Sequence, residues 1–430
     1  MNKFDKYKIP IFISLNILVL ISLFGMAYAY FKATVNNAES ASTISIESGE
    51  LTINYQGNTP DIVASGIVPG WSETKKFTLS GKNTTKTNEF HTDNNLYYKI
   101  ILAIDNNTFS EGALTYSLAK DSTSSTNGKM ADEASGTINQ SGNQIIGYGY
   151  FTETSTFVDH IYNLTISFPS TEYEQSADNG KSFAAHVTIG EGKYIKTTTF
   201  AADSWGTIAE AIKNGQLDAY PVGTEKEVEI GGTSYTVRVA NNTTPKECTT
   251  NEDFSQTACG FVVEFADIVE KRSMNSSSTN VGGWRDSEMW TYANGAFFNN
   301  LPEDLRNVIK DTKVVSGHGS NDTSNFPSTD KIYLLSAHEV YEDGTSNQIS
   351  SYDKAWDKTR QLDYYKIKGV TTNSYSSAIK KDINGNDSIW WLRAAYSSNN
   401  YSFLSVGSSG TWGITAPYTT RGFAPAFRIG

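Results

Sequence analysis

HIYNLTISF, residues 160–168, carries the clearest structural signal in this chain of 430 residues. Its apolar side chains occupy every second position, which places them on one face of a β-strand: Tyr162, Leu164, Ile166 and Phe168. The same alternation occurs in STISIESGELTINYQ (42–56) and in KSFAAHVTI (181–189), and turn-forming stretches such as SADNG (176–180) separate such runs. No long helical period interrupts them. Residues 35–200 are therefore predicted to form an all-β sandwich of jelly-roll-like type.

The N-terminus predicts the compartment of the protein. MNKFDKYK supplies lysines at 3, 6 and 8, and residues 9–30 are almost entirely apolar. Because positive charge marks the cytoplasmic flank, everything after residue 30 is expected on the extracellular face of the cell membrane or secreted. Residues 1–34 are either a membrane anchor, which holds the protein through residues 9–30, or an export signal cleaved after Ala29.

Composition argues against a nucleic-acid partner, and it leaves undecided whether the two cysteines are bonded. The net charge is −11, and no basic cluster follows the N-terminus, so nucleic acid is not an expected partner. The two cysteines, Cys248 and Cys259, either close a small disulfide loop outside the cell or remain unpaired thiols. They have no histidine close by, so no metal site is predicted for them.

Beyond residue 203 the pattern changes to short helices mixed with hairpins. DSWGTIAEAIKNG (203–215) predicts a helix that begins after Asp203 or Ser204 and stops at Gly215, and KEVEIGGTSYTVRV (226–239) predicts a hairpin. A second helix is expected in LPEDLRNVIKDT (301–312), and strands in CGFVVEFADIV (259–269), SIWWLRA (388–394) and FAPAFRI (423–429). Of the adjacent Trp390 and Trp391, one is expected in the core and the other exposed. Residues 203–430 are thus predicted to form an α+β domain.

The last segment has the composition of a binding surface. From Ala394 onward the chain has no Lys, Glu, Gln, Asp, His, Met or Cys, but it is rich in Ser, Gly, Asn and aromatic residues. Rigid aromatic rings and small polar residues are the set that binding loops use. The candidate ligand-binding residues are Tyr396, Asn399, Asn400, Tyr401, Phe403, Thr411, Trp412, Tyr418 and Arg421. Their aromatic rings are expected to be exposed, whereas Phe427 and Ile429 are expected in the core; an ordinary Ser/Gly-rich loop, with its tyrosines buried, is the alternative.

Two resemblances extend these predictions. The export segment ending AYAYF (27–31), with ATVNNAESASTISIESGELTINY (33–55) and VPGWSETKKFTLSGKN (68–83), resembles the camelysin/TasA-like family. That resemblance implies a β-sandwich that serves as a surface or biofilm-matrix subunit.

The second resemblance covers residues 203–430. TACGFVVEFADIV (257–269), GGW (282–284), NFPSTDKIYLLSAHEVY (325–341), TRQLDYY (359–365), WWLR (390–393) and the terminal PAFRIG occur in a fixed order. Together they resemble an exported bacterial and phage domain of unknown function with a C-type-lectin-like fold, related to formylglycine-generating enzymes and to targets of diversity-generating retroelements. The resemblance implies a ligand-binding domain whose tail is varied by a retroelement. Trp290, Ala394 and Ala424 depart from the family pattern.

Catalysis is not expected. No cysteine follows Cys259 to serve as the thiolate that formylglycine-generating relatives use, and no His-Glu-x-x-His motif is present. Ser316, His318 and Asp322 are common loop residues rather than a convincing triad. DINGND (382–387) is expected to be a turn rather than a cation loop, and His91, His160 and His186 are read as structural residues, so no cofactor is predicted.

The sequence therefore predicts a non-catalytic, exported bacterial surface protein for recognition or adhesion. Residues 394–421 of its lectin-like domain would bind an extracellular protein or glycan ligand. The alternative is a structural subunit of a biofilm matrix or surface fibre that assembles through strands of residues 35–200.

Overall fold

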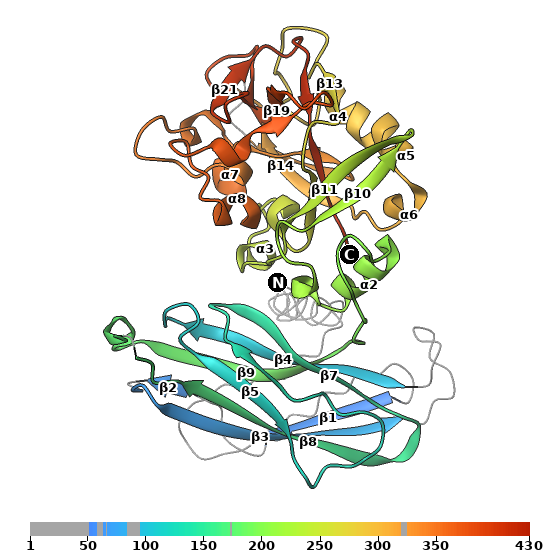
Figure 1. The fold of residues 1–430 in the computed structure, drawn as a ribbon, viewed down its shortest axis with the longest axis vertical. Helices are drawn as coiled ribbons and strands as arrows, with labels where there is room; N and C mark the ends of the chain where they lie inside the picture. Colours follow the sequence, from blue (N-terminus) through green and yellow to red (C-terminus); the bar gives the residue numbers. More distant parts are fainter. Residues whose placement is uncertain (1–50, 58–62, 66, 84–94, 173, 320–324) are drawn as a thin grey trace, which may run out of the picture. The chain divides into compact units, whose positions relative to one another are not determined.

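The computed structural model describes residues 51–57, 63–65, 67–83, 95–172, 174–319 and 325–430. It divides into two compact units, Met1–Lys193 and Tyr194–Gly430 (Figure 1). The predicted export segment, residues 1–34, and His91 lie outside the described residues. No helix within the described ranges is long and apolar enough to cross a membrane.

In its described residues, the first unit contains strands and one single-turn helix, Ser176–Asp178. Its strands are β1 (Leu51–Gly57), β2 (Val63–Ser65), β3 (Trp71–Asn83), β4 (Leu96–Asn107), β5 (Thr115–Lys120), β6 (Ala134–Thr137), β7 (Gly142–Phe151), β8 (Thr154–Phe168) and β9 (Ser182–Glu191). They form a five-stranded sheet in the order β1-β3-β8-β5-β6 and a four-stranded sheet in the order β2-β9-β4-β7. All the pairs are antiparallel.

One hydrophobic cluster unites the two sheets. The alternating side chains of β8 are buried against those of β4 and β9, so the period-two pattern of HIYNLTISF does mark an inward face. His160 lies in this core: its Nδ1 is 2.6 Å from the Tyr98 hydroxyl and its Nε2 is 2.7 Å from the Asn127 carbonyl. Burial lowers the pKa of His160, which favours the neutral ring. His186, by contrast, faces Asp105, with 2.9 Å between Nδ1 and the carboxylate.

The second unit contains short helices and many short strands. The helices are α2 (Trp205–Lys213), α3 (Glu247–Thr250), α4 (Glu288–Tyr292), α5 (Phe298–Asn300), α6 (Glu303–Arg306), α7 (Ala337–Val340) and α8 (Asp363–Ile367). A π-helical turn spans Ala293–Phe297, and single 3₁₀ turns span Leu217–Ala219, Gln256–Ala258, Ser350–Tyr352, Trp356–Lys358 and Ser376–Ala378. The strands are β10 (Glu225–Ile230), β11 (Thr233–Asn241), β12 (Val262–Phe265), β13 (Glu270–Arg272), β14 (Thr312–Gly317), β15 (Asn325–Asp330), β16 (Tyr333–Leu334), β17 (Lys380–Lys381), β18 (Asp387–Ser388), β19 (Trp390–Ala395), β20 (Phe403–Val406), β21 (Trp412–Thr415), β22 (Arg421–Phe423) and β23 (Pro425–Arg428).

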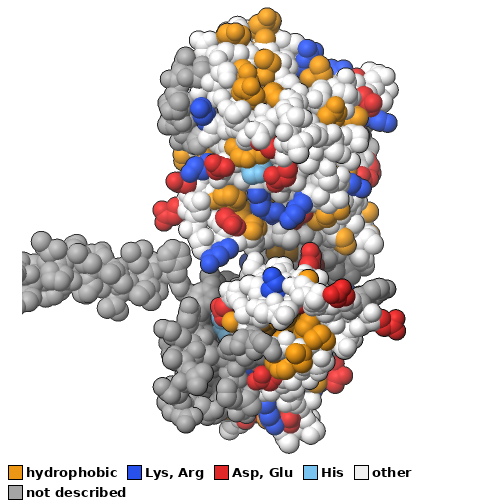
Figure 2. All heavy atoms as spheres, turned by 90° about the vertical axis from the view of Figure 1, so that its left-hand side faces the viewer, with side chains coloured by type: hydrophobic (Ala, Val, Ile, Leu, Met, Phe, Trp, Pro, Cys, Tyr) orange, Lys and Arg blue, Asp and Glu red, His pale blue; other side chains and the backbone are white. Residues whose placement is uncertain are grey.

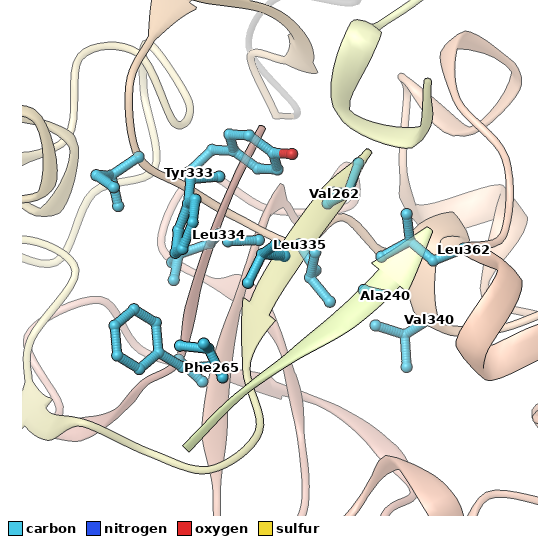
Figure 3. Close-up of a cluster of buried hydrophobic side chains, with 14 of the residues drawn as sticks. Ala240, Val262, Phe265, Tyr333, Leu334, Leu335, Val340 and Leu362 are labelled. Carbon is cyan, nitrogen blue, oxygen red and sulfur yellow. The ribbon is translucent and has the colours of Figure 1, made fainter. Parts of the chain in front are cut away.

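Two five-stranded sheets organise this unit. One has the order β10-β11-β12-β23-β16, and the other has the order β13-β22-β19-β20-β21; β14-β15 and β17-β18 are separate two-stranded pairs. Figure 3 shows part of the single large core, in which side chains of β11, β12 and β16 meet those next to α7 and α8. The labelled residues are Ala240, Val262, Phe265, Tyr333, Leu334, Leu335, Val340 and Leu362. With strands dominant in both units and few helices, the chain is a multidomain protein of mainly β structure.

Local sequence signals explain several elements of the second unit. Helix α2 begins after Ser204, whose side chain accepts a hydrogen bond from the Thr207 N–H, and the chain turns at Gly215, where φ is +92°. The β10–β11 hairpin turns at Gly231 and Gly232, both with positive φ, as a two-residue turn of this kind requires. Phe427 and Ile429 are buried, as predicted.

Three predictions were wrong in detail. Trp390 and Trp391 are both fully buried, because β19 lies inside its sheet and is covered on both faces. The helix expected over 301–312 is only α6, because Lys310 N–H instead donates to the Arg428 carbonyl at 2.9 Å. Residues 194–200, assigned to the first domain, belong to the second unit, where Ile195 and Phe200 join the core.

Candidate functional site

The candidate surface is the segment 394–421, which runs from the end of β19 through β20 and β21 to the first residue of β22. Tyr401 is 52% exposed and Tyr418 is 59% exposed, and Asn400 is also exposed. The remaining predicted residues except Phe403 are half-buried: Tyr396, Asn399, Thr411, Trp412 and Arg421. The surface thus presents two exposed tyrosines among partly accessible polar and aromatic side chains.

Phe403 corrects the prediction. It was expected to be exposed, but it is fully buried in β20 and packs against Trp391, with 6.5 Å between the ring centroids. The alternation along β20 cannot place it outside, because all four residues of this strand are buried. Phe403 therefore belongs to the core, and it is removed from the candidate ligand-contacting residues.

Two of the predicted residues belong to an aromatic row, Tyr396–Tyr352–Trp412. The ring of Tyr352 lies 5.1 Å from that of Tyr396 and 5.5 Å from that of Trp412. Trp412 Nε1 also donates to the Asn347 carbonyl at 3.1 Å. Sequence reasoning missed Tyr352, since it lies far from the tail in the chain and its neighbours SSYDK carry no distinguishing signal.

The loop that carries Tyr401 is held by one buried amide. Asn280 Nδ2 lies within hydrogen-bond distance of the carbonyls of Tyr396 (3.1 Å), Asn399 (2.9 Å) and Ser402 (2.7 Å). The Asn280 N–H donates to the Asn400 carbonyl at 2.9 Å. Four loop carbonyls thus depend on one residue, and this fixes the backbone around the exposed ring of Tyr401.

The loop that carries Tyr418 is anchored through its neighbour. The Pro417 carbonyl accepts from the N–H groups of Met274 (2.8 Å) and Asn275 (3.1 Å), beyond the end of the β13–β22 ladder. Further along, Arg421 stands directly opposite Arg272 in this ladder. Arg421 Nε is buried and has no hydrogen-bond partner among the described residues.

Hydrophobic side chains are visible on the side of the second unit where Figure 1 draws β21. Figure 2 faces that side and shows several groups of them towards the upper end of this unit, among surface that is mostly neither charged nor hydrophobic. Ile414 of β21 is 50% exposed, although the sequence reasoning, which weighed aromatic rings, did not select it. The sequence WGIT (412–415) could have indicated Ile414, because residues two apart in a strand lie on the same face and Ile414 follows Trp412 by two residues.

Trp284 and Trp290 share one carboxylate. Trp284 Nε1 donates to Asp330 Oδ2 at 2.7 Å, and Trp290 Nε1 donates to Asp330 Oδ1 at 2.8 Å. Burial raises the pKa of Asp330, although these hydrogen bonds oppose the shift. Trp290 therefore has a specific structural partner.

Polar residues that could serve catalysis or metal binding make structural contacts instead. His338 stacks on Trp356 with ring centroids 4.0 Å apart, and the Asp382 carboxylate accepts from Lys271 (2.7 Å) and from two N–H groups of its own turn. Asp322 lies outside the described residues, so the Ser316–His318–Asp322 grouping is not defined. Across the part of the chain that the structure describes, no three His, Cys, Asp or Glu side chains are placed to hold a metal ion.

Cys248 and Cys259 form a disulfide bond, with 5.9 Å between their Cα atoms. The bond closes a short loop that also contains the buried Ser255 and Thr257. It links α3 to the residues that lead into β12.

Comparison with known families gives one match in the second unit. Residues 261–430 match a family described as a domain of unknown function, DUF6273. The match begins just before β12, so it leaves out β10 and β11 although these strands complete the same sheet. Neither the curated proteins nor the solved structures gave a match to this chain.

Proposed function

We propose that this chain is an exported, non-catalytic recognition or adhesion protein of the bacterial cell surface. In this proposal the first unit is a jelly-roll-like β-sandwich that supports a C-type-lectin-like second unit. The second unit binds an extracellular protein or glycan ligand through residues 394–421, and a retroelement diversifies that segment. The sandwich assignment is supported by the two antiparallel sheets that share one core.

One observation carries the binding proposal. Tyr401 and Tyr418 are more than half exposed in a segment without acidic residues, on loops whose backbones are held by Asn280 and by the Met274–Asn275 pair. Tyrosine rings that are exposed on an ordered backbone are accessible to a ligand. Rigid tyrosines lose little conformational entropy on binding, which suits them to contact a ligand.

A binding screen with matched variants tests the proposal. The full-length chain in detergent is exposed to a glycan array and to a phage-displayed library of random linear peptides. Tyr401→Ala and Tyr418→Ala should each weaken capture of the selected probes by about 1–3 kcal/mol, as removal of a binding anchor does. Ile367→Ala is the control, because Ile367 is exposed in the same unit but lies outside the segment.

Two results would overturn the proposal. One is that neither probe collection yields a ligand, and the other is that both tyrosine variants bind as the wild type does. Diversification is tested separately in the genome, where a reverse transcriptase gene and a near-copy of the codons for the tail are expected beside the gene.

A further inference from the structure

The strand β21 lies at the edge of the sheet β13-β22-β19-β20-β21 and pairs only with β20 among the described strands. The Gly407 N–H donates to the Thr411 carbonyl at 2.7 Å, immediately outside the Val406–Trp412 pair. In an antiparallel ladder, hydrogen-bonded pairs alternate with pairs that are not hydrogen-bonded. The Val406–Trp412 pair follows the hydrogen-bonded Gly407–Thr411 pair, so its own N–H and C=O groups point away from each other. Trp412, and two residues later Ile414, therefore direct their backbone groups away from β20.

These outward groups are available for pairing with another strand. Within the described ranges, the Ile414 N–H and C=O have no hydrogen-bond partner, and the Trp412 carbonyl receives only the Thr411 hydroxyl at 3.5 Å. The side chain of Ile414 is half exposed and shares its face of the strand with the half-buried Trp412. An apolar side chain and a free donor–acceptor pair thus occur at the same residue.

The edge strands β10 and β13 of this unit differ from β21, and the two-residue edge strand β16 is uncharged but buried. Edge strands normally carry charges, proline or bulges that prevent unwanted pairing. Strand β10 reads EKEVEI and strand β13 reads EKR, so both are charged, whereas β21 reads WGIT and has none of these protections. The unprotected edge lies within the segment already proposed to bind a ligand.

We propose that β21 binds an extended segment of a protein ligand as an added strand, paired through the backbone of Ile414 and Trp412. The inference rests on the proposed function and specifies its ligand: a peptide strand with an apolar residue beside Ile414 and free N–H groups at the paired positions. Main-chain hydrogen bonds provide affinity in this mode, and alternate side chains provide specificity.

A second copy of this chain is a poorer occupant than a peptide. Pairing two four-residue strands buries far less than the roughly 1,200–2,000 Å² of a stable protein interface. The net charge of −11 on each copy also opposes association. A short peptide, in contrast, needs only one extended segment to pair with β21 and does not carry this charge.

The experiment uses peptides selected from the random library by the full-length chain in detergent. Ile414→Pro removes the outward N–H, and proline is tolerated where an edge N–H faces solvent. The affinity of the selected peptides should fall at least tenfold for Ile414→Pro, whereas Ile414→Val, which keeps the backbone and a β-branched side chain, should bind within about twofold of the wild type. Near-ultraviolet circular dichroism checks that each variant keeps its packing.

A scan of the peptide itself is independent of the folding of any variant. N-methylation at successive positions of a selected peptide should abolish binding at every second residue and spare the residues between, because only alternate N–H groups face β21. Uniform tolerance of methylation, or equal binding by Ile414→Pro, would overturn the proposal. So would glycan ligands in the absence of peptide ligands, or a wild-type dimer that Ile414→Pro converts to a monomer. If binding depends on Tyr401 and Tyr418 but not on Ile414, the proposed function stands and this inference fails.

Discussion

Arg393 of the WWLR motif and Glu339 of the SAHE motif form a doubly hydrogen-bonded ion pair in the core. Arg393 Nη1 lies 2.5 Å from Glu339 Oε2, and Nη2 lies 2.6 Å from Oε1. The exposed fractions of the two side chains are 1% and 0%. Thr257 and Thr359 donate their hydroxyls to the same carboxylate, so the pair joins β19, α7 and two loops.

Glu339→Gln should destabilise the second unit strongly. The substitution keeps the size of the side chain but leaves the Arg393 charge buried without a counter-charge, and breaking a buried pair in this way costs about 3–5 kcal/mol. Urea unfolding of the full-length chain, followed by tryptophan fluorescence, measures the change. Glu342→Gln, at an exposed position nearby, is the control and should change stability by less than about 0.5 kcal/mol. A small effect of Glu339→Gln would show that the pair adds little to folding.

The contribution of Glu339 should disappear in acid. Burial by itself would raise its pKa, but the Arg393 charge and the hydrogen bonds hold the pKa below the ordinary value of 4.5. Since the folded-state pKa is the lower one, this contribution is complete above about pH 4.5 and is lost as the pH falls through the folded-state pKa. The difference in unfolding free energy between wild type and Glu339→Gln, measured from pH 7 downwards, should therefore shrink only below about pH 4.5. A difference that stays constant into strong acid would contradict this assignment.

Phe403→Ala and Tyr401→Ala should have opposite effects although the two residues are neighbours in the chain. Phe403 is fully buried, so its truncation should cost about 3–5 kcal/mol of stability. Tyr401 is 52% exposed, so its truncation should leave stability nearly unchanged while it weakens ligand capture. Calorimetry of both variants tests this, and because each unit has a core of its own, Phe403→Ala should lower only the transition of the second unit.

Reduction of the Cys248–Cys259 disulfide should destabilise the second unit by about 2–4 kcal/mol, the usual range for closure of a short loop. Thermal unfolding with and without dithiothreitol measures the change, and the mass of an alkylated sample verifies that reduction is complete. The double variant Cys248→Ala/Cys259→Ala should reproduce the shift and should not respond to the reductant. An unchanged transition after verified reduction would show that the bond is dispensable for stability.

Asn280→Ala should reduce ligand capture without a change to any exposed side chain. The amide of Asn280 holds the loop carbonyls of Tyr396, Asn399 and Ser402, so its removal should let the loop around Tyr401 move and raise the entropic cost of binding. Capture of the selected probes by Asn280→Ala and by Asn386→Ala, a control at an exposed position of the same unit outside the segment, should differ at least threefold. Hydrogen exchange of the amides of 396–402 should rise in Asn280→Ala alone.

Much of the local structure could be predicted from sequence because it depends on neighbours in the chain. The Ser204 cap, the Gly231–Gly232 turn and the alternation in residues 160–168 each depend on a few adjacent residues. The end of α6 could not be predicted, since the Lys310 N–H finds its partner at Arg428, more than a hundred residues away in the chain.

By itself, the sequence determined the dominance of β structure, the buried closing strand with Phe427 and Ile429, and the unusual composition of the tail. Only the tertiary structure decided which tail residues face solvent. Period-two alternation separates the two faces of a strand but cannot tell whether one face or both are covered, and for this reason Phe403, Trp390 and Trp391 are all buried. The open edge at Ile414 also could not be predicted from the sequence, because strand order in a sheet depends on contacts between residues far apart in the chain.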